Sequence, residues 1–267
     1  MPTNNTFAST KNDWKRLADI DYFGMYVKAY IPFNAWMNIN YEAEKTDRDK
    51  ISAIRGNANP FKNKIVSLIE DDDQAGEDFR TWIGSLHAAL EQARIYNKGN
   101  YISFTDIVFK NDSNEYEYRK RQTVFRVQRV VDDSGKTIVR VVIKSLSDGQ
   151  ILCDEEFKDY ICDIKKAAQQ LKSKIPEKYL GVTLDCYKQI APYVNKSLLA
   201  LKPKAKKVRR CGRFKFVQET DAVAQGLISV FYKLRNALFH GEINPNDDAN
   251  KVYGAAYHLL RRVIECL

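Results

Sequence analysis

The sequence predicts a mainly α protein, a helical bundle into which a small antiparallel β-hairpin or sheet is inserted. Two observations carry this prediction. Apolar residues recur at helical spacing towards both ends of the chain, whereas residues 101–145 are rich in β-branched residues and contain the turn sequence DDSGK. We expect one domain built from residues 13–99 and 146–267, with residues 100–145 as the insertion, because two or three strands alone are marginally stable.

The first expected helices lie at residues 19–41 and 78–96. The first segment is dense in aromatic residues, and Pro32 within it predicts a kink or the start of a second helix. The second segment follows the acidic loop EDDDQAGED, and acidic residues suit the positive end of a helix dipole. Its apolar stripe consists of Phe79, Ile83, Leu86 and Leu90.

The extended segments are TVFRVQRVV and TIVRVVIK, preceded by an expected strand at residues 102–109. Val139, Val141 and Ile143 share one face of the second strand, and Arg140 and Lys144 share the other, since side chains alternate along a strand. One side of the insertion is therefore expected to pack and the other to be basic. Helical patterns return at residues 157–171 and 177–194.

Two C-terminal helices complete the expected bundle. The first carries a stripe of Val223, Leu227, Phe231, Leu234 and Leu238, and Gly241 suits a left-handed cap that ends the helix at His240. The second follows the loop EINPNDD. Arg235, Asn236 and His240 are thus expected in one polar sector at the helix end.

The chain has 267 residues, 44% of them hydrophobic, and a formal net charge of +9, so it can bury a sizeable core and attract polyanions. The alternative interpretation is ordinary solvated surface charge. We expect an RNA-contacting surface on the hairpin and on the connector LKPKAKKVRRCGRFKF. The residues expected to contact RNA on this surface are Arg126, Arg129 and Arg140 of the hairpin and Lys206, Lys207, Arg209 and Arg210 of the connector.

Five cysteines without a C-x-x-C pair indicate free thiols rather than a disulfide framework or a zinc site. The N-terminus lacks the apolar core of a signal peptide, and no later apolar run is long enough to span a bilayer. We therefore expect a cytoplasmic protein without membrane contact.

Arginine offers a permanent planar cation to phosphate, and histidine moves protons near neutral pH. Together Arg235 and His240 suit cleavage of RNA through its own 2′-hydroxyl group, with Asn236 as a supporting polar group, so no metal ion or cofactor is expected. The alternative is structural: Arg235 pairs with an acid such as Glu242, and His240 caps its own helix. An E-x-K tripeptide at Glu156–Lys158 is a weaker indication of a metal-dependent nuclease.

The segment LRNALFHGE resembles the R-N-x-x-x-H signature of HEPN proteins, and YIPFNAWMNINY, with Asn34, resembles the Phe-Asn-Ala element of an early HEPN helix. The resemblance implies a HEPN-like bundle, a homodimer with a composite active site, and a metal-independent ribonuclease of toxin–antitoxin or antiviral defence. It assigns phosphate binding to Arg235, acid–base work to His240 and support to Asn236. It also implies an antitoxin or another protein regulator as a possible partner.

Some HEPN relatives are not catalytic, and similarity of fold does not establish activity. The alternative function is therefore a non-catalytic RNA-binding or protein-interaction module.

Overall fold

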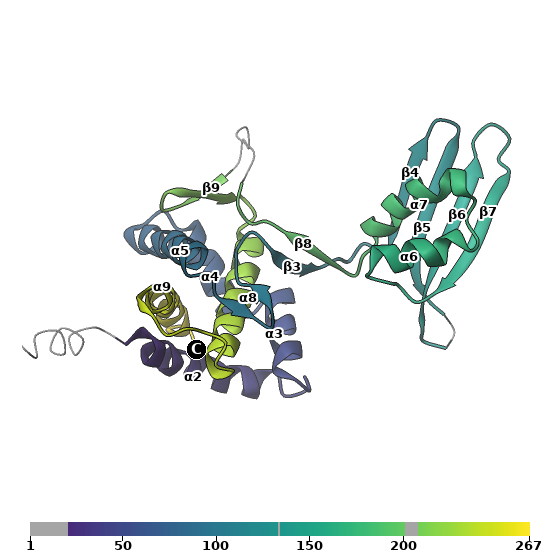
Figure 1. Ribbon diagram of the computed structural model, residues 1–267. Helices are drawn as coiled ribbons and strands as arrows, with labels where there is room; N and C mark the ends of the chain where they lie inside the picture. Colours follow the sequence, from purple (N-terminus) through teal and green to yellow (C-terminus); the bar gives the residue numbers. More distant parts are fainter. Residues whose placement is uncertain (1–20, 133, 201–207) are drawn as a thin grey trace, which may run out of the picture. The chain divides into compact units, whose positions relative to one another are not determined.

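The computed structural model describes residues 21–132, 134–200 and 208–267 (Figure 1). The chain divides into two compact units. The first unit comprises Met1–Ile107 and Ser197–Leu267, and the second comprises Val108–Lys196. Each unit is described by itself below.

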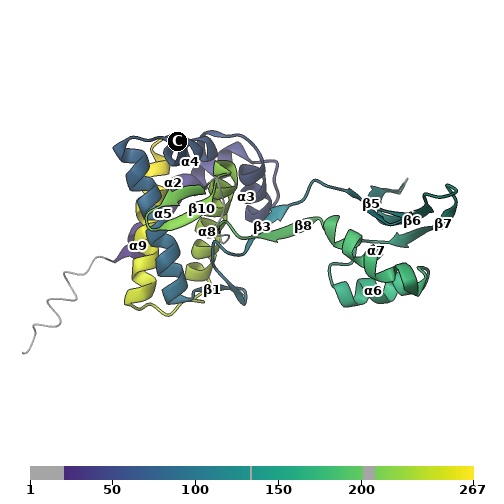
Figure 2. The same ribbon diagram turned by 90° about the horizontal axis from the view of Figure 1, so that it is seen from above.

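The described part of the first unit is built mainly from helices that pack around a buried aromatic and aliphatic core (Figure 2). Helix α9 packs against both α2 and α5, while α3 and α4 pack against α8. The helices are α2 (Tyr22–Asn40), α3 (Asp47–Gly56), α4 (Pro60–Glu70), α5 (Gln74–Ala93), α8 (Thr220–Phe239) and α9 (Asp247–Ile264).

Two buried tyrosines join the neighbouring helices to the backbone of α8. The hydroxyl of Tyr26 on α2 donates to the carbonyl oxygen of Phe231 at 2.6 Å, and that of Tyr253 on α9 donates to the carbonyl of Leu234 at 2.8 Å. Both rings are fully buried, so each hydroxyl needs such a partner. These bonds hold α2 and α9 against the part of α8 that leads to Arg235.

Helix α2 runs unbroken through Pro32, so no second helix starts at this residue, and the alternative of a kink there stays a prediction. Pro32 is exposed, where water can satisfy the carbonyl that loses its intrahelical partner. Helices α3 and α4 were not expected, although both have ordinary start signals. The side chains of Thr46 and Asn59 accept from the backbone of the first turns, and Pro60 occupies the first position of α4.

Two short hairpins complete the described first unit. Strands β1 (Tyr96–Asn97) and β2 (Asn100–Tyr101) form one, and β9 (Val208–Cys211) and β10 (Phe214–Val217) form the other. The second hairpin packs on α5 at Gly84, where an added Cβ atom would lie 2.3 Å from the carbonyl oxygen of Cys211. Only glycine therefore permits this close approach.

The second unit contains a four-stranded antiparallel sheet in the order β4-β5-β6-β7, with α6 and α7 on one of its faces (Figure 1). Strands β3 and β8 pair separately. The bounds are β3 (Ile107–Lys110), β4 (Glu115–Lys120), β5 (Thr123–Val131), β6 (Thr137–Ser145), β7 (Ile151–Lys158), α6 (Ile164–Lys172), α7 (Glu177–Gln189) and β8 (Tyr193–Lys196).

The helix-covered face of this sheet forms a core of its own, in which Val139, Val141 and Ile143 are fully buried against residues of α6 and α7 such as Leu171 and Tyr187. The predicted alternation along β6 is therefore confirmed. The exposed side chains of Arg140 and Lys144 lie on the opposite face.

The prediction of a mainly α, HEPN-like bundle with one small hairpin is wrong. The chain is a mixed α/β protein, about half helix and a fifth strand, and its described residues contain ten strands in four sheets. Residues 108–145 of the expected insertion at residues 100–145 belong to a larger unit that also contains β7, α6 and α7, whereas residues 100–107 belong to the first unit. These elements supply the buried surface that two or three strands lack by themselves.

The predicted helical segments in this region have different bounds. Phe157 ends up in β7, where it faces the same core as Val139, and α6 begins only at Ile164. Tyr193 and Val194 belong to β8 rather than to α7. No helix in the described ranges is long and apolar enough to cross a membrane.

Candidate functional site

Helix α8 presents its apolar stripe to the core and ends where the sequence predicts. Val223, Leu227, Phe231 and Leu234 are buried, and the helix closes with His240 as its C-cap residue. Gly241 adopts the left-handed conformation, with φ of 66°. The N–H of Gly241 donates to the carbonyl of Leu238 at 3.2 Å, and that of Glu242 donates to Ala237 at 2.9 Å.

These two hydrogen bonds form a Schellman cap. The cap uses only backbone groups of His240 and its neighbours, so the imidazole itself is not needed to end the helix. The side chain of His240 is exposed. His240 is thus the C-cap residue, as the structural alternative expects, and the cap hydrogen bonds come from backbone groups.

Arg235 is held at the surface by groups from two helices. Its guanidinium lies 3.6 Å from the carboxylate of Asp47 in the first turn of α3, and it donates to Oδ1 of Asn236 at 3.0 Å. The same guanidinium lies over the ring of Phe239, 5.0 Å from its centroid. The side chain keeps 27% of its surface exposed, which leaves part of the cation open to an incoming anion.

Asn236 is almost fully buried, with 5% of its surface exposed. Its side chain therefore points inward beside Arg235, whereas His240, one turn later, is exposed. In the described residues no hydrogen bond joins the imidazole of His240 to Arg235 or Asn236. The structure thus brings Arg235 and Asn236 into contact and leaves His240 as a separate group at the helix end.

Tyr30 on α2 adds a buried polar group beside this cluster. Burial raises the pKa of its phenol, and the charge of Asp47 raises it further, while the cation of Arg235 opposes both effects. Tyr30 therefore stays protonated at physiological pH and can act there only as a neutral hydroxyl.

Glu242 does not pair with Arg235, which was one expectation for this residue. Its carboxylate instead accepts from Nδ2 of Asn97 at 2.9 Å and from the backbone N–H of Lys98 at 3.0 Å. These two bonds, followed by the charges of His240 and Lys98, hold the pKa of Glu242 below its ordinary value. The tip of the β1–β2 hairpin is thereby attached to the segment that carries His240.

The predicted RNA contacts on the connector are described only in part. Lys206 and Lys207 lie outside the described residues. Arg209 and Arg210 lie on β9 of the first unit, where Arg210 is exposed. Arg209 is half-buried, and its Nε atom has no hydrogen-bond partner among the residues that the structure describes.

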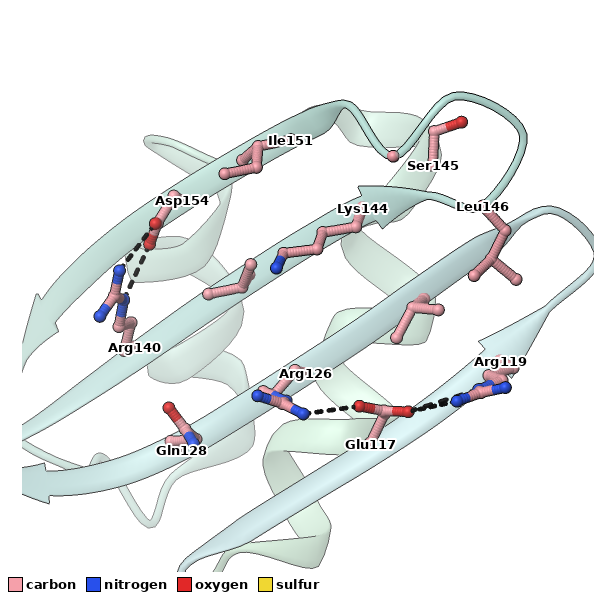
Figure 3. Close-up of a pocket in the computed structure, with 13 residues that line it drawn as sticks. Glu117, Arg119, Arg126, Gln128, Arg140, Lys144, Ser145, Leu146, Ile151 and Asp154 are labelled. Atoms are coloured by element: carbon pink, nitrogen blue, oxygen red, sulfur yellow. Dashed lines mark hydrogen bonds and ion pairs between the residues drawn. The ribbon is translucent and has the colours of Figure 1, made fainter.

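The other three predicted contacts belong to the second unit, and carboxylates or carbonyls engage each of them. Arg140 binds the carboxylate of Asp154 with two donors, at 2.9 and 2.8 Å, on the open face of the sheet (Figure 3). Arg126 pairs with Glu115 and Glu117 at 3.0 Å each. A phosphate that binds here competes with these carboxylates.

The ion pairs on this face of the sheet lower the pKa values of the carboxyl groups that take part in them. The hydrogen bond from Arg140 lowers the pKa of Asp154, and that from Arg126 lowers the pKa of Glu117. Lys144 lies beside them, without an ion pair in the part of the chain that the structure describes (Figure 3).

Arg129 is held in place by hydrogen bonds to backbone carbonyl groups. Its guanidinium donates to the carbonyls of Ile190 at 2.6 Å and of Asn111 and Ser113 at 3.3 Å each. It therefore ties β5 to the two chain segments that flank the sheet. Its predicted RNA contact stays a prediction, as do those of Arg126 and Arg140.

Glu156 and Lys158 of the E-x-K tripeptide lie on β7. The described residues contain no group of three or more histidine, cysteine, aspartate or glutamate side chains placed to hold a metal ion. The five cysteines are free.

Sequence reasoning missed Asp47 and Lys98 at this site. The turn Lys98-Gly99 lacks the Asn-Gly or Asp-Gly pair that signals a two-residue hairpin, and the two strands it joins are too short to stand out by periodicity. No signal in the sequence indicates the pairing of Asp47 with Arg235.

No protein-family model, no curated protein and no solved structure matches the chain. The HEPN resemblance of LRNALFHGE and YIPFNAWMNINY therefore stays a prediction, and the geometry of the site carries the functional argument.

Proposed function

We propose that this chain is an endoribonuclease that cleaves RNA without a metal ion, with Arg235, Asn236 and His240 as its working residues. The observation that supports this proposal is the end of α8: a backbone cap frees the imidazole of His240, and Arg235, five residues earlier, is anchored yet partly open. An accessible imidazole and a fixed cation are the two groups that cleavage through the 2′-hydroxyl requires.

In the proposed reaction the 2′-oxygen of the RNA attacks the adjacent phosphorus, and the bond from phosphorus to the 5′-oxygen breaks. His240 accepts the proton of the 2′-hydroxyl, and an acid gives a proton to the departing 5′-oxygen. The products are a 2′,3′-cyclic phosphate and a 5′-hydroxyl end. Arg235 stabilises the charge that develops on the phosphoryl oxygens, and Asn236 orients Arg235 through the bond of 3.0 Å.

A single His240 cannot accept the proton of the 2′-hydroxyl and donate a proton to the 5′-oxygen in the same step. We propose that the active form is a homodimer, in which His240 of a second copy supplies the acid. This arrangement fits the exposure of the imidazole at the helix end. A role in defence, under the control of an antitoxin or another protein regulator, is part of the same proposal.

The decisive test is RNA cleavage by the wild-type chain and by His240→Ala in the presence of EDTA. His240→Ala should fold normally because the cap uses backbone groups, and it should lose cleavage by at least about a hundredfold, the usual contribution of general acid–base catalysis. His258→Ala is the matched control, since this imidazole stacks on Trp82 in another part of the unit. Full activity of His240→Ala would refute the proposal.

A second candidate function is a non-catalytic RNA-binding or protein-interaction module. The observation that favours it is the engagement of Arg235 by Asp47, Asn236 and Phe239, which would also suit a purely structural arginine. RNA binding that survives both Arg235→Ala and His240→Ala, with no cleavage by the wild-type chain, would favour this function.

A further inference from the structure

The β1–β2 hairpin of the first unit is short and has a well-defined turn. Tyr96 pairs with Tyr101 and Asn97 with Asn100, and the turn residues Lys98 and Gly99 have φ of 51° and 75°. Two consecutive residues with positive φ make the type I′ turn that matches the twist of a hairpin. The shape of the tip is therefore set locally.

Both ends of the hairpin are attached to the unit. At its base, the hydroxyl of Tyr101 donates to the carbonyl of Leu90 on α5 at 2.8 Å. At its tip, Glu242 accepts from the side chain of Asn97 and the backbone of Lys98. Glu242 follows His240 by two residues, so this carboxylate links the tip to the end of α8. Strand β1 also packs against α8.

The hairpin carries two exposed side chains, Lys98 at its tip and Tyr96 at its base. Tyr96 keeps 48% of its surface exposed, although its ring lies 5.9 Å from that of Tyr101 between the centroids. The charges of Lys98 and His240 both act on the carboxylate of Glu242. An exposed cation and an exposed aromatic ring thus lie on a hairpin that Glu242 attaches to the chain segment carrying His240.

We propose that this hairpin positions single-stranded RNA at the site: Lys98 at its tip contacts a phosphate next to the one that is cleaved, and Tyr96 at its base stacks on an unpaired base. The proposal rests on the proposed function and deepens it, because it names the substrate class. A base within a duplex is stacked between its neighbours and cannot offer its face to a tyrosine, whereas an unpaired base can. Glu242 is a positioning residue, which acts by holding the tip.

Binding can be measured without cleavage on RNA whose 2′-hydroxyls are methylated. Lys98→Asn removes the cation but suits the left-handed turn, so the hairpin should persist. It should weaken binding several-fold and lower the slope of log affinity against log salt by about 0.7, the value for one contact to a single strand. Lys28→Gln, an exposed lysine on α2, is the matched control and should change neither quantity.

Tyr96→Ala should weaken binding by about five- to a hundredfold, and Tyr96→Phe should restore it, since stacking needs the ring and not the hydroxyl. Glu242→Ala should weaken binding as Lys98→Asn does, whereas Glu242→Gln should retain it because the amide oxygen accepts the same two hydrogen bonds. In cleavage assays these losses should raise KM and leave kcat largely unchanged.

The outcomes separate this inference from the proposed function. If the wild-type chain does not cleave but Lys98→Asn and Tyr96→Ala weaken binding as expected, the proposed function fails and the hairpin contact stands. If the wild-type chain cleaves and His240→Ala does not, while Lys98→Asn and Tyr96→Ala bind like the wild type, the inference is overturned. Equal affinity for single-stranded and fully paired RNA would also overturn it.

Discussion

The carboxylate of Asp47 lies 3.6 Å from the guanidinium of Arg235, and this contact joins the first turn of α3 to the C-terminal part of α8. Both side chains are partly exposed, with 40% and 27% of their surface open. An ion pair at this level of exposure contributes little to stability, about 0.2–1 kcal/mol. It is therefore weak enough to be exchanged for a phosphate, and under the proposed function Asp47 would compete with RNA for Arg235.

Asp47→Asn should tighten RNA binding by about two- to fivefold, because it removes this competing charge while keeping the shape of the side chain. The affinity is measured on RNA with methylated 2′-hydroxyls at low salt. Asp49→Asn is the matched control: it lies in the same turn of α3, and its side chain accepts from the hydroxyl of Thr46 instead. Weaker binding by Asp47→Asn, to the level of Arg235→Ala, would mean that Asp47 orients Arg235 rather than competing for it.

Gly84→Ala should destabilise the first unit by about 1–3 kcal/mol or more, because the new Cβ atom would lie 2.3 Å from the carbonyl oxygen of Cys211. The hairpin of β9 and β10 would have to move off α5. Gly181→Ala, inside α7, meets no atom within 4 Å and should stabilise by about 0.5–1 kcal/mol through helix propensity. Thermal unfolding midpoints of both variants test this opposite pair of effects, and equal shifts would contradict it.

Arg129→Ala should lower the free energy of unfolding of the second unit by about 2 kcal/mol, since it removes charged donors from the carbonyls of Ile190, Asn111 and Ser113. Arg126→Ala, whose pairs with Glu115 and Glu117 are half-exposed, should cost less than about 1 kcal/mol. Urea unfolding measures both values. A larger loss for Arg126→Ala than for Arg129→Ala would contradict this division.

Stability should fall as the pH drops below about 6.5, because His87 is buried and its pKa is lowered from that ordinary value. Burial is the main cause; Arg213 lowers the pKa further and Glu91 opposes the shift. The unfolded chain then binds a proton that the folded chain does not, so the contribution is complete above 6.5 and is lost towards acid.

The measurement for His87 is the unfolding midpoint between pH 7.5 and 5, where His87→Gln should show a shallower decline than the wild type. His258, whose pKa is also lowered by burial and by Arg261, adds to the same slope. His258→Gln therefore serves as the comparison. An identical slope for His87→Gln and the wild type would show that His87 does not contribute.

The sequence alone predicted features that depend on neighbours along the chain. The apolar stripe of α8, the left-handed cap at Gly241 and the alternation of Val139, Val141 and Ile143 were all readable from local pattern. Local pattern also placed Arg235 and His240 at a helix end, because helical geometry and capping are decided within a few residues.

The same local reading gave the wrong fold class. Strand β4, with the sequence EYEYRK, is exposed along its whole length, and the charged run DEE interrupts the apolar residues of β7, so neither carries a clear alternation of buried apolar residues. They are strands because β5 and β6 offer them backbone hydrogen bonds. Such pairing joins residues that are distant in sequence, and it completes the four-stranded sheet on which the core of the second unit is built.

The tertiary structure alone decided the surroundings of the candidate site. Arg235 meets Asp47 rather than Glu242, Asn236 is buried rather than displayed beside His240, and Glu242 holds Lys98 of a hairpin far away in sequence. A residue's neighbours along the chain determine whether it lies in a helix and where that helix ends. Ion pairs and hydrogen bonds between distant segments depend instead on which elements pack together. The sequence therefore determined which residues stand at the end of α8, and only the packed fold determined what each of them contacts.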